Sequence, residues 1–311
     1  MTSALIVGAQ GSGRTTFVGL LYTASVRFGT EETDRFRFTA ERESIRRLES
    51  IYGALGAGKF PEGDLDREAE PLRFVFGFRR GGLPHWPRNG GSADEFDTVP
   101  VHVAGMPADE IAEIEEQDPV LDEETRRVLR SPVVIALVNA ALLPPEPGGI
   151  DGLVNARYDH VLARTLETVA RYLSSERNRR SRRLFPVFVL TQFDRMPEAT
   201  RRALEVPEGE PSTWTPAART ALGTRILDAH LPETARFVHP GPHGRVTVSP
   251  APWYFSELST QEDGAQGLRI RRRSRIPVGG WEPQYPYEEY RSLLLELGHR
   301  ARLTPSIAAA A

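Results

Sequence analysis

The stretch Gly8-Ala9-Gln10-Gly11-Ser12-Gly13-Arg14-Thr15 directly follows the apolar run Ala4-Leu5-Ile6-Val7. Glycines at positions 8 and 13, followed by a cation and a hydroxyl, have the spacing of a phosphate-binding loop. Glycines let the backbone bend so that several amide hydrogens point at one phosphate. The helix that follows adds the positive end of its dipole. The sequence therefore predicts a phosphate site between a first strand and a first helix.

One position departs from this pattern, because Arg14 stands where such a loop normally has lysine. Lysine is a compact point charge on a thin stem, whereas arginine is a planar fork with a different reach. Lys59 is the only lysine among the 39 Lys and Arg residues, so the departure follows a general bias toward arginine. A glycine-rich connection that binds no ligand is the alternative interpretation of the same stretch.

Composition bounds the class of protein. The chain has 311 residues, of which 40% are hydrophobic, enough for one elaborated domain or two small ones. Its net charge of −3 creates no overall field toward nucleic acid or membranes. The absence of cysteine excludes disulfides and thiolate metal sites. No apolar run approaches the roughly 20 residues of a membrane helix, and the N-terminus lacks a signal pattern, so we expect a cytoplasmic location and no integral membrane segment.

Predicted strands and helices alternate along the chain. We expect strands over 3–7, 71–79, 96–104, 132–138, 184–190, 245–249 and 268–276, and helices over 14–28, 40–56, 107–117, 120–130, 155–177, 216–230 and 286–302. Such alternation favours a mostly parallel sheet with helices on both faces, whose ligands bind at the carboxyl ends of the strands. We expect the main domain to span 1–260, with 261–303 packing on it as a C-terminal strand and helix, and 304–311 as a disordered tail.

Three further stretches lie at or directly after the ends of predicted strands. They are Thr191-Gln192-Phe193-Asp194, His102-Val103-Ala104-Gly105 and Val246-Thr247-Val248-Ser249-Pro250-Ala251. In their order along the chain, together with the glycine-rich loop, they resemble the motifs of the TRAFAC class of P-loop GTPases, in a prokaryotic Ras-like branch. The resemblance covers residues 3 to about 250 in motif order and not in close identity. It implies a three-layer sandwich with one antiparallel edge strand, and GTP or GDP with Mg²⁺ as ligands.

The resemblance assigns roles to particular residues. The phosphate cradle would comprise Gly8, Gln10, Gly11, Ser12, Gly13, Arg14, Thr15 and Thr16, with the Thr15 hydroxyl on Mg²⁺. Asp194 would accept hydrogen bonds from the guanine ring, supported by Thr191, with Gln192 in place of the family's lysine. An aspartate after a strand is also a common helix cap. Ser249 would belong to the segment that closes over the base. Pro250 lacks the amide hydrogen that this segment donates, so either the register differs by one residue or the guanine contact is weakened.

The remaining motif is altered. Gly105 occupies the position of the glycine that senses the γ-phosphate, but His102 replaces the family's magnesium-linked aspartate and Met106 replaces its water-orienting residue. A neutral histidine does not supply the negative charge that Mg²⁺ prefers, and His102 is equally well interpreted as a plain strand residue. No switch threonine is identifiable among Thr30, Thr33 and Thr39, and no catalytic residue is assigned.

The altered positions surround the γ-phosphate and the metal, whereas the cradle and the base motif are better kept. Because phosphoryl transfer depends on electrostatic positioning, we expect guanine nucleotide binding with weak or no hydrolysis, and a role as a switch or scaffold for a protein partner. Two alternatives stay open: an active GTPase that needs a partner or a dimer, and a nucleotide-free scaffold. The arginine runs at 177–183 and 269–275 are interpreted as solvated surface and not as a nucleic-acid site.

Overall fold

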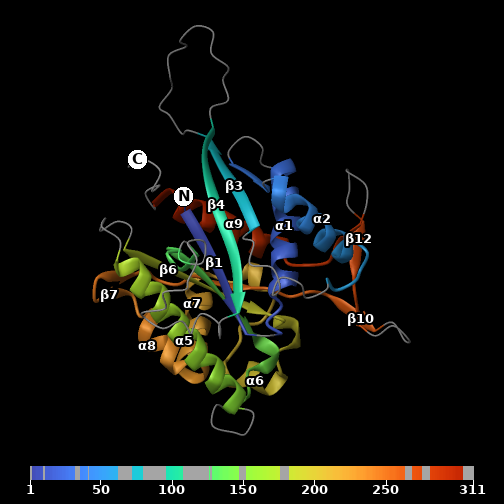
Figure 1. Cartoon of the computed structure of the whole chain (residues 1–311). Helices are drawn as coiled ribbons and strands as arrows, with labels where there is room; N and C mark the ends of the chain where they lie inside the picture. The colour runs from blue at the N-terminus through green and yellow to red at the C-terminus, as the bar shows by residue number, and fades with distance from the viewer. Residues whose placement is uncertain are drawn as a thin grey trace.

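In the computed structural model, helices cover both faces of one central β-sheet (Figure 1). The described residues are 2–9, 11–31, 36–40, 42–61, 72–79, 96–107, 126, 128–146, 152–175, 182–262, 268–274 and 281–303. The sheet comprises β1 (Thr2–Gly8), β2 (Phe36–Ala40), β3 (Leu72–Arg79), β4 (Phe96–Pro107), β5 (Val133–Asn139), β6 (Arg183–Thr191), β7 (Gly241–His243), β8 (Val246–Val248) and β9 (Trp253–Phe255). The predicted α/β class with a mostly parallel sheet is therefore confirmed.

The described helices differ widely in length. They are α1 (Arg14–Glu31), α2 (Arg42–Gly56), α5 (Gly152–Ser174), α6 (Glu198–Ala203), α7 (Pro216–His230), α8 (Pro232–Val238) and α9 (Tyr287–Leu303). Short 3-10 turns lie at η2 (Ala140–Leu142), η4 (Phe193–Arg195) and η5 (Pro211–Thr213). None of the helices in the described part of the chain combines the length and the apolar character that a bilayer crossing requires.

The sheet order is β2-β3-β4-β1-β5-β6-β8-β7, and β9 also pairs with β6. The pairs β4–β1, β1–β5, β5–β6 and β6–β9 are parallel, whereas β3 is antiparallel to both of its neighbours and β7 is antiparallel to β8. The expectation of a single antiparallel edge strand was therefore wrong. The strand β2, a short alternating segment that we did not predict, lies outside β3 and makes β3 an internal strand.

Alternating side chains of the central strands build two cores. On one face, Ile135 of β5 packs in a cluster that includes Phe17 of α1 and Leu294 of α9. On the other face, Ala136 belongs to a cluster that includes Leu166 of α5. Because successive strand residues point to opposite faces, the apolar run of β5 is buried on both sides, as parallel strands generally are.

Several expectations on short elements were wrong. The single strand expected at 268–276 is two strands, β11 (Leu268–Ile270) and β12 (Arg272–Ser274), which pair with β10 (Thr260–Glu262) and β13 (Trp281–Pro283) in two small hairpins. The helices α6 and α8 and the strands β7 and β9 were not predicted, because segments of three to seven residues carry too little periodicity. Most of the expected helices at 107–117 and 120–130, and the whole tail at 304–311, lie outside the described residues.

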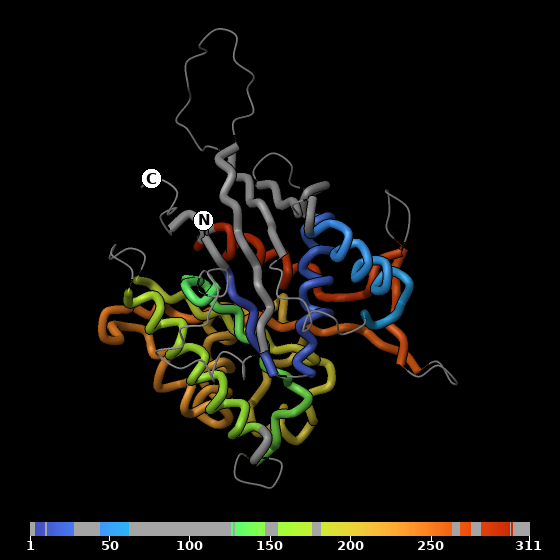
Figure 2. The backbone as a smooth tube through the Cα atoms, in the orientation of Figure 1, coloured from blue at the N-terminus to red at the C-terminus, as the bar shows by residue number. Residues whose placement is uncertain are grey.

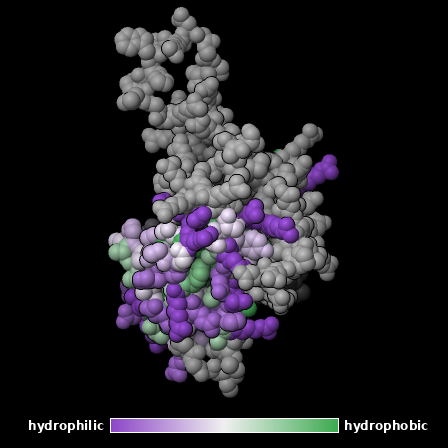
Figure 3. Space-filling model, turned by 60° about the vertical axis from the view of Figure 1, so that its left-hand side comes forward, coloured by the Kyte–Doolittle hydropathy of each residue, from purple (hydrophilic) through white to green (hydrophobic). Residues whose placement is uncertain are grey.

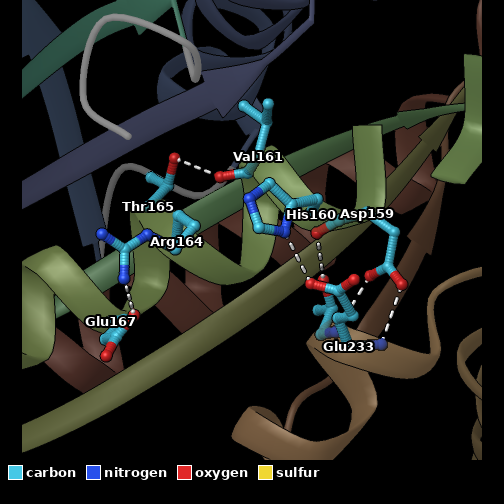
Figure 4. Close-up of polar contacts among 8 residues, drawn as sticks. Asp159, His160, Val161, Arg164, Thr165, Glu167 and Glu233 are labelled. Carbon is cyan, nitrogen blue, oxygen red and sulfur yellow. Dashed lines mark hydrogen bonds and ion pairs between the residues drawn. The ribbon is translucent and has the colours of Figure 1, made fainter. Parts of the chain in front are cut away.

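The helix α8 is anchored to α5 through a buried carboxylate. Asp159 is 2% exposed and accepts hydrogen bonds from the backbone N–H groups of Glu233 (2.8 Å) and Thr234 (2.9 Å). Figure 4 shows Asp159 pointing at the first turn of α8. Beside it, His160 Nδ1 lies 2.8 Å from Glu233 Oε2. The first turn of a helix has N–H groups without partners inside the helix, so an anion there is stabilised. Where Figure 3 colours the surface, most of it is hydrophilic, with a strip of hydrophobic residues near the centre.

Candidate functional site

The glycine loop, residues 8–13, connects β1 to α1. Gly11 and Gly13 both have positive φ values, +79° and +80°, which glycine adopts without steric cost. The Ser12 N–H donates to the Ala9 carbonyl at 3.0 Å, and the Phe17 N–H donates to the Gly13 carbonyl at 2.8 Å, where α1 begins. The loop therefore bends tightly at the carboxyl end of β1 and directly precedes a helix.

A side chain at Gly8 would collide with this bend. A Cβ atom built there lies 2.3 Å from the Ser12 hydroxyl, which is itself buried and finds no hydrogen-bond partner among the described residues. Gly8 is therefore required by close packing and not by its backbone angles. Gln10, the remaining predicted cradle residue of the loop, lies outside the described residues.

Three polar side chains from the ends of β5 and β6 hold the loop. The Asn139 side-chain amide donates to the Gly11 carbonyl at 3.2 Å, and that of Gln192 donates to the same carbonyl at 3.1 Å. The Thr191 hydroxyl donates to the Ser12 carbonyl at 2.8 Å. Asn139 and Thr191 face each other in the register of β5 and β6. The parallel topology thus brings the base-motif segment onto the glycine loop, 179 residues earlier in the chain.

The first turn of α1 carries the predicted charge and hydroxyls. Arg14 is only 7% exposed. Burial raises the pKa of Tyr158 on α5, and the positive charge of Arg14 partly opposes this increase. The guanidinium thus lies close enough to α5 to influence that phenol. Thr15 and Thr16 are half-buried. Of these three residues, Thr16 lines the cavity described next.

A cavity of about 240 Å³ joins the glycine loop to the end of β6. Gly11, Gly13 and Thr16 line one part of it, and Thr191 and Asp194 line another. The remaining lining residues are Phe17, Leu20, Phe60, Gln192, Arg195, Ser256, Glu257, Leu258, Thr260 and Leu268. Three residues of the predicted cradle therefore share one cavity with the predicted base motif, at the carboxyl ends of the parallel strands, whereas Ser12 lines a second cavity of about 350 Å³ on the α5 side of the loop.

Two carboxylates of this cavity have raised pKa values. Partial burial raises the pKa of Asp194, opposed by backbone N–H groups, among them that of Leu258, and by the charges of Arg195 and Arg201. Burial also raises the pKa of Glu257, and the negative charge of Asp194 adds to this increase. Both groups therefore accept a proton more readily than an ordinary surface carboxylate.

The structure corrects the position of the segment that follows the last central strand. Ser249 comes directly after β8, whose partner residues lie at the start of β6, and its N–H donates to Leu184. Thr191 is seven residues further along β6, a separation of about 23 Å at the usual rise per strand residue. Ser249 thus lies at the wrong end of the sheet for the role we expected. Pairing of β8 with the early part of β6 was not visible in the sequence.

Segment 256–258 lies beside Thr191, at the end of the sheet where we expected Ser249. It follows β9, in which Phe255 pairs with Leu190, so that Ser256 comes to lie beside Thr191. The Ser256 N–H donates to the Leu190 carbonyl at 2.7 Å, and the Phe193 N–H donates to the Ser256 carbonyl at 3.2 Å. This segment, Ser-Glu-Leu, contains no proline, so each of its residues has a backbone N–H.

The position of Gly105 also differs from our expectation. The strand β4 continues to Pro107, so Gly105 lies within it and pairs with Ile6, while Pro107 pairs with Gly8. His102 pairs with Ser3, five residues before Gly8, which is about 17 Å along the strand. Neither His102 nor an aspartate in its place would therefore reach a metal at the glycine loop. The register of β4 against β1 decides this, and the sequence does not reveal it.

Buried polar contacts with α9 hold segment 256–258 in position. Glu289 of α9 accepts a hydrogen bond from the Phe255 N–H at 3.1 Å and forms a two-pronged ion pair with Arg219 of α7. The Ser256 hydroxyl lies 2.6 Å from the Tyr290 hydroxyl. The helices α7 and α9, far apart in sequence from the glycine loop, thus position one wall of the cavity.

Sequence reasoning missed Asn139 and segment 256–258. Asn139 is a polar residue at the end of a buried strand, so the rule that placed Thr191 could have found it. Segment 256–258 likewise follows the apolar run Trp253-Tyr254-Phe255, but three residues are too few to be recognised as a strand. Phe60 and Leu268 gave no signal of a role at this site.

Within the described part of the chain, no three His, Asp or Glu residues come together in a way that would hold a metal ion. Thr15, the second residue of α1, was the predicted metal contact, and that role stays a prediction. Comparison with protein-family models gives no match, and no curated protein matches this sequence significantly.

Proposed function

We propose that the chain binds a guanine nucleotide with weak or no hydrolysis, as a switch or scaffold for a protein partner. The observation that carries the proposal is the shared cavity, in which the glycine loop and Asp194 lie together. The loop offers backbone N–H groups at a helix start for phosphates. Asp194 offers a carboxylate for the ring and exocyclic N–H groups that guanine, but not adenine, presents together.

The cavity itself suits the base end of such a ligand. Pockets for whole small molecules typically have volumes of about 300–1,000 Å³, so a cavity of about 240 Å³ receives part of a nucleotide. Gly11 is solvent-exposed at its rim, where the phosphates would leave the cavity along the loop. Segment 256–258 supports the proposal because it contains no proline, so it has backbone N–H groups close to Asp194.

The expectation of weak hydrolysis now depends on Arg14 and on Met106, which replaces the family's water-orienting residue. His102 lies too far along β4 to have replaced a metal-linked carboxylate, so its identity no longer counts against hydrolysis. Arg14 does, because a planar guanidinium has a different reach from the compact lysine charge that such a loop normally places over the phosphates. Loss of one electrostatic element of this kind typically costs about 10²–10³ in rate.

Isothermal titration calorimetry with GDP, GTP and ATP, with and without Mg²⁺, tests the proposal. We expect both guanine nucleotides to bind and ATP to bind more weakly. Asp194→Asn should weaken GDP binding and favour xanthosine diphosphate, since the amide donates to the oxygen that xanthine carries in place of the amine. Asp228→Asn on the exposed face of α7 is the matched control. Absence of binding by every nucleotide would overturn the proposal, and ordinary GTPase turnover would overturn its hydrolysis part.

A further inference from the structure

Loop 57–61 leaves α2 and carries an exposed aromatic ring to the cavity. Gly58 has a positive φ of +78°, and its N–H donates to the Leu55 carbonyl at 3.0 Å, which ends the helix. Phe60 follows and is 43% exposed, yet it lines the same cavity as Asp194. A ring of this size that is partly exposed to water and lines a cavity has no role in the core.

The loop is held there by the small hairpins. The Ile270 N–H of β11 donates to the Gly58 carbonyl at 2.9 Å, and a Cβ atom at Gly58 would lie 3.1 Å from the Ile270 carbonyl. The end of α2 and the hairpins lie side by side in Figure 2. The close approach means that loop 57–61 and β11 form one wall.

The same hairpin places a second apolar side chain on the cavity. Leu268, at the start of β11, is 41% exposed and lines the cavity together with Thr260 of β10. The Arg271 N–H donates to the Ser259 carbonyl at 2.8 Å, directly after segment 256–258. The hairpin therefore joins the apolar wall to the segment that lies beside Asp194.

Resting on the proposed function, we propose that Phe60 and Leu268 form an apolar clamp on the flat face of the bound base. Asp194 reads the edge of that base, so it provides the choice of guanine. The clamp contacts the π-face, which every purine has, so it increases the affinity for the nucleotide without selecting guanine over other purines. Burial of the ring and of the leucine against a base would remove both from water, which accounts for two partly exposed apolar side chains that line this cavity.

Substitution of each clamp residue tests this inference by calorimetry with GDP and Mg²⁺. Stacking on an aromatic side chain contributes about 1–3 kcal/mol per base, so Phe60→Ala should weaken GDP binding roughly 5- to 150-fold. Leu268→Ala should weaken it less, and Phe60→Tyr should retain it. Leu142→Ala is the matched control, because Leu142 is 55% exposed and lines a different cavity, of about 350 Å³, between the glycine loop and α5.

A spectroscopic experiment separates stacking from a general effect on the fold. In Phe60→Trp the new indole should be quenched on addition of GDP, relative to the wild-type signal, whereas in Leu142→Trp it should not. Wild-type GDP affinity in Phe60→Ala and an unquenched indole in Phe60→Trp would overturn the clamp while leaving the proposed function in place. A wild-type protein that binds no guanine nucleotide would overturn both.

Discussion

The Thr191 hydroxyl donates a hydrogen bond of 2.8 Å to the Ser12 carbonyl, joining the end of β6 to the glycine loop. Thr191 is buried, so neither group has an alternative partner in bulk water. The bond fixes the distance between the two halves of the candidate site. A ligand that occupies both halves therefore meets a preorganised geometry, which lowers the cost of binding.

Thr191→Val keeps the shape of the side chain and removes its hydroxyl. The Ser12 carbonyl would then be buried without this donor, which typically costs about 1–3 kcal/mol. We expect the free energy of unfolding in urea to fall by that amount, and the affinity for GDP to fall with it. Thr191→Ser, which keeps the hydroxyl, should change both much less. Equal stability of Thr191→Val and the wild type would show that the bond contributes nothing.

The buried ion pair behind the cavity gives a larger effect on stability. Glu289 is 3% exposed, and Glu289→Gln would leave Arg219 without its compensating charge. Breaking a buried pair in this way costs about 3–5 kcal/mol, so the midpoint of thermal unfolding should fall by many degrees. The neighbouring Glu288→Gln affects an exposed pair with Arg291 at 3.5 Å and should cost less than about 1 kcal/mol. Similar losses for both variants would contradict the assignment.

Two helical glycines should respond oppositely to the same substitution. A Cβ atom at Gly223 of α7 would lie 2.1 Å from the Trp253 indole nitrogen, so Gly223→Ala forces the ring or the helix to move. Overpacking of this kind costs about 1–3 kcal/mol. Gly53 of α2 has open space around it, and Gly53→Ala should stabilise by about 0.5–1 kcal/mol through helix propensity. Chemical denaturation of the two variants measures both; stabilisation by Gly223→Ala would contradict the packing.

Nucleotide affinity should fall as the pH is lowered. Partial burial raises the pKa of Asp194, so its carboxylate is protonated at a higher pH than an ordinary aspartate, near 3.9. A protonated carboxyl accepts the base N–H groups poorly, so GDP binding and protonation compete. Calorimetry from pH 7.5 downward should show weakening that begins above the usual aspartate range. In Arg195→Gln, which removes a positive charge that lowers the pKa of Asp194, the weakening should begin at a higher pH. A flat profile would contradict the role of Asp194.

Much of the fold was predictable because long elements have strong periodicity. The helix expected at 216–230 coincides with α7, and the strands expected at 132–138 and 184–190 differ from β5 and β6 by one residue at each end. The rule that ligands bind at strand ends brought Thr191 and Asp194 to the same edge as the glycine loop. The rule misplaced Ser249, because a short strand can pair with either end of a long one.

The sequence by itself determined the tight turn after β1, since only glycines adopt its backbone angles at Gly11 and Gly13 without strain. It likewise determined which runs are buried strands, because their apolar character is local. Tertiary structure alone decided that segment 256–258 and not Ser249 stands beside Thr191, that His102 lies far from the loop, and that Phe60 reaches the cavity. Strand register and the docking of distant segments depend on contacts between residues far apart in the chain, which no local pattern encodes.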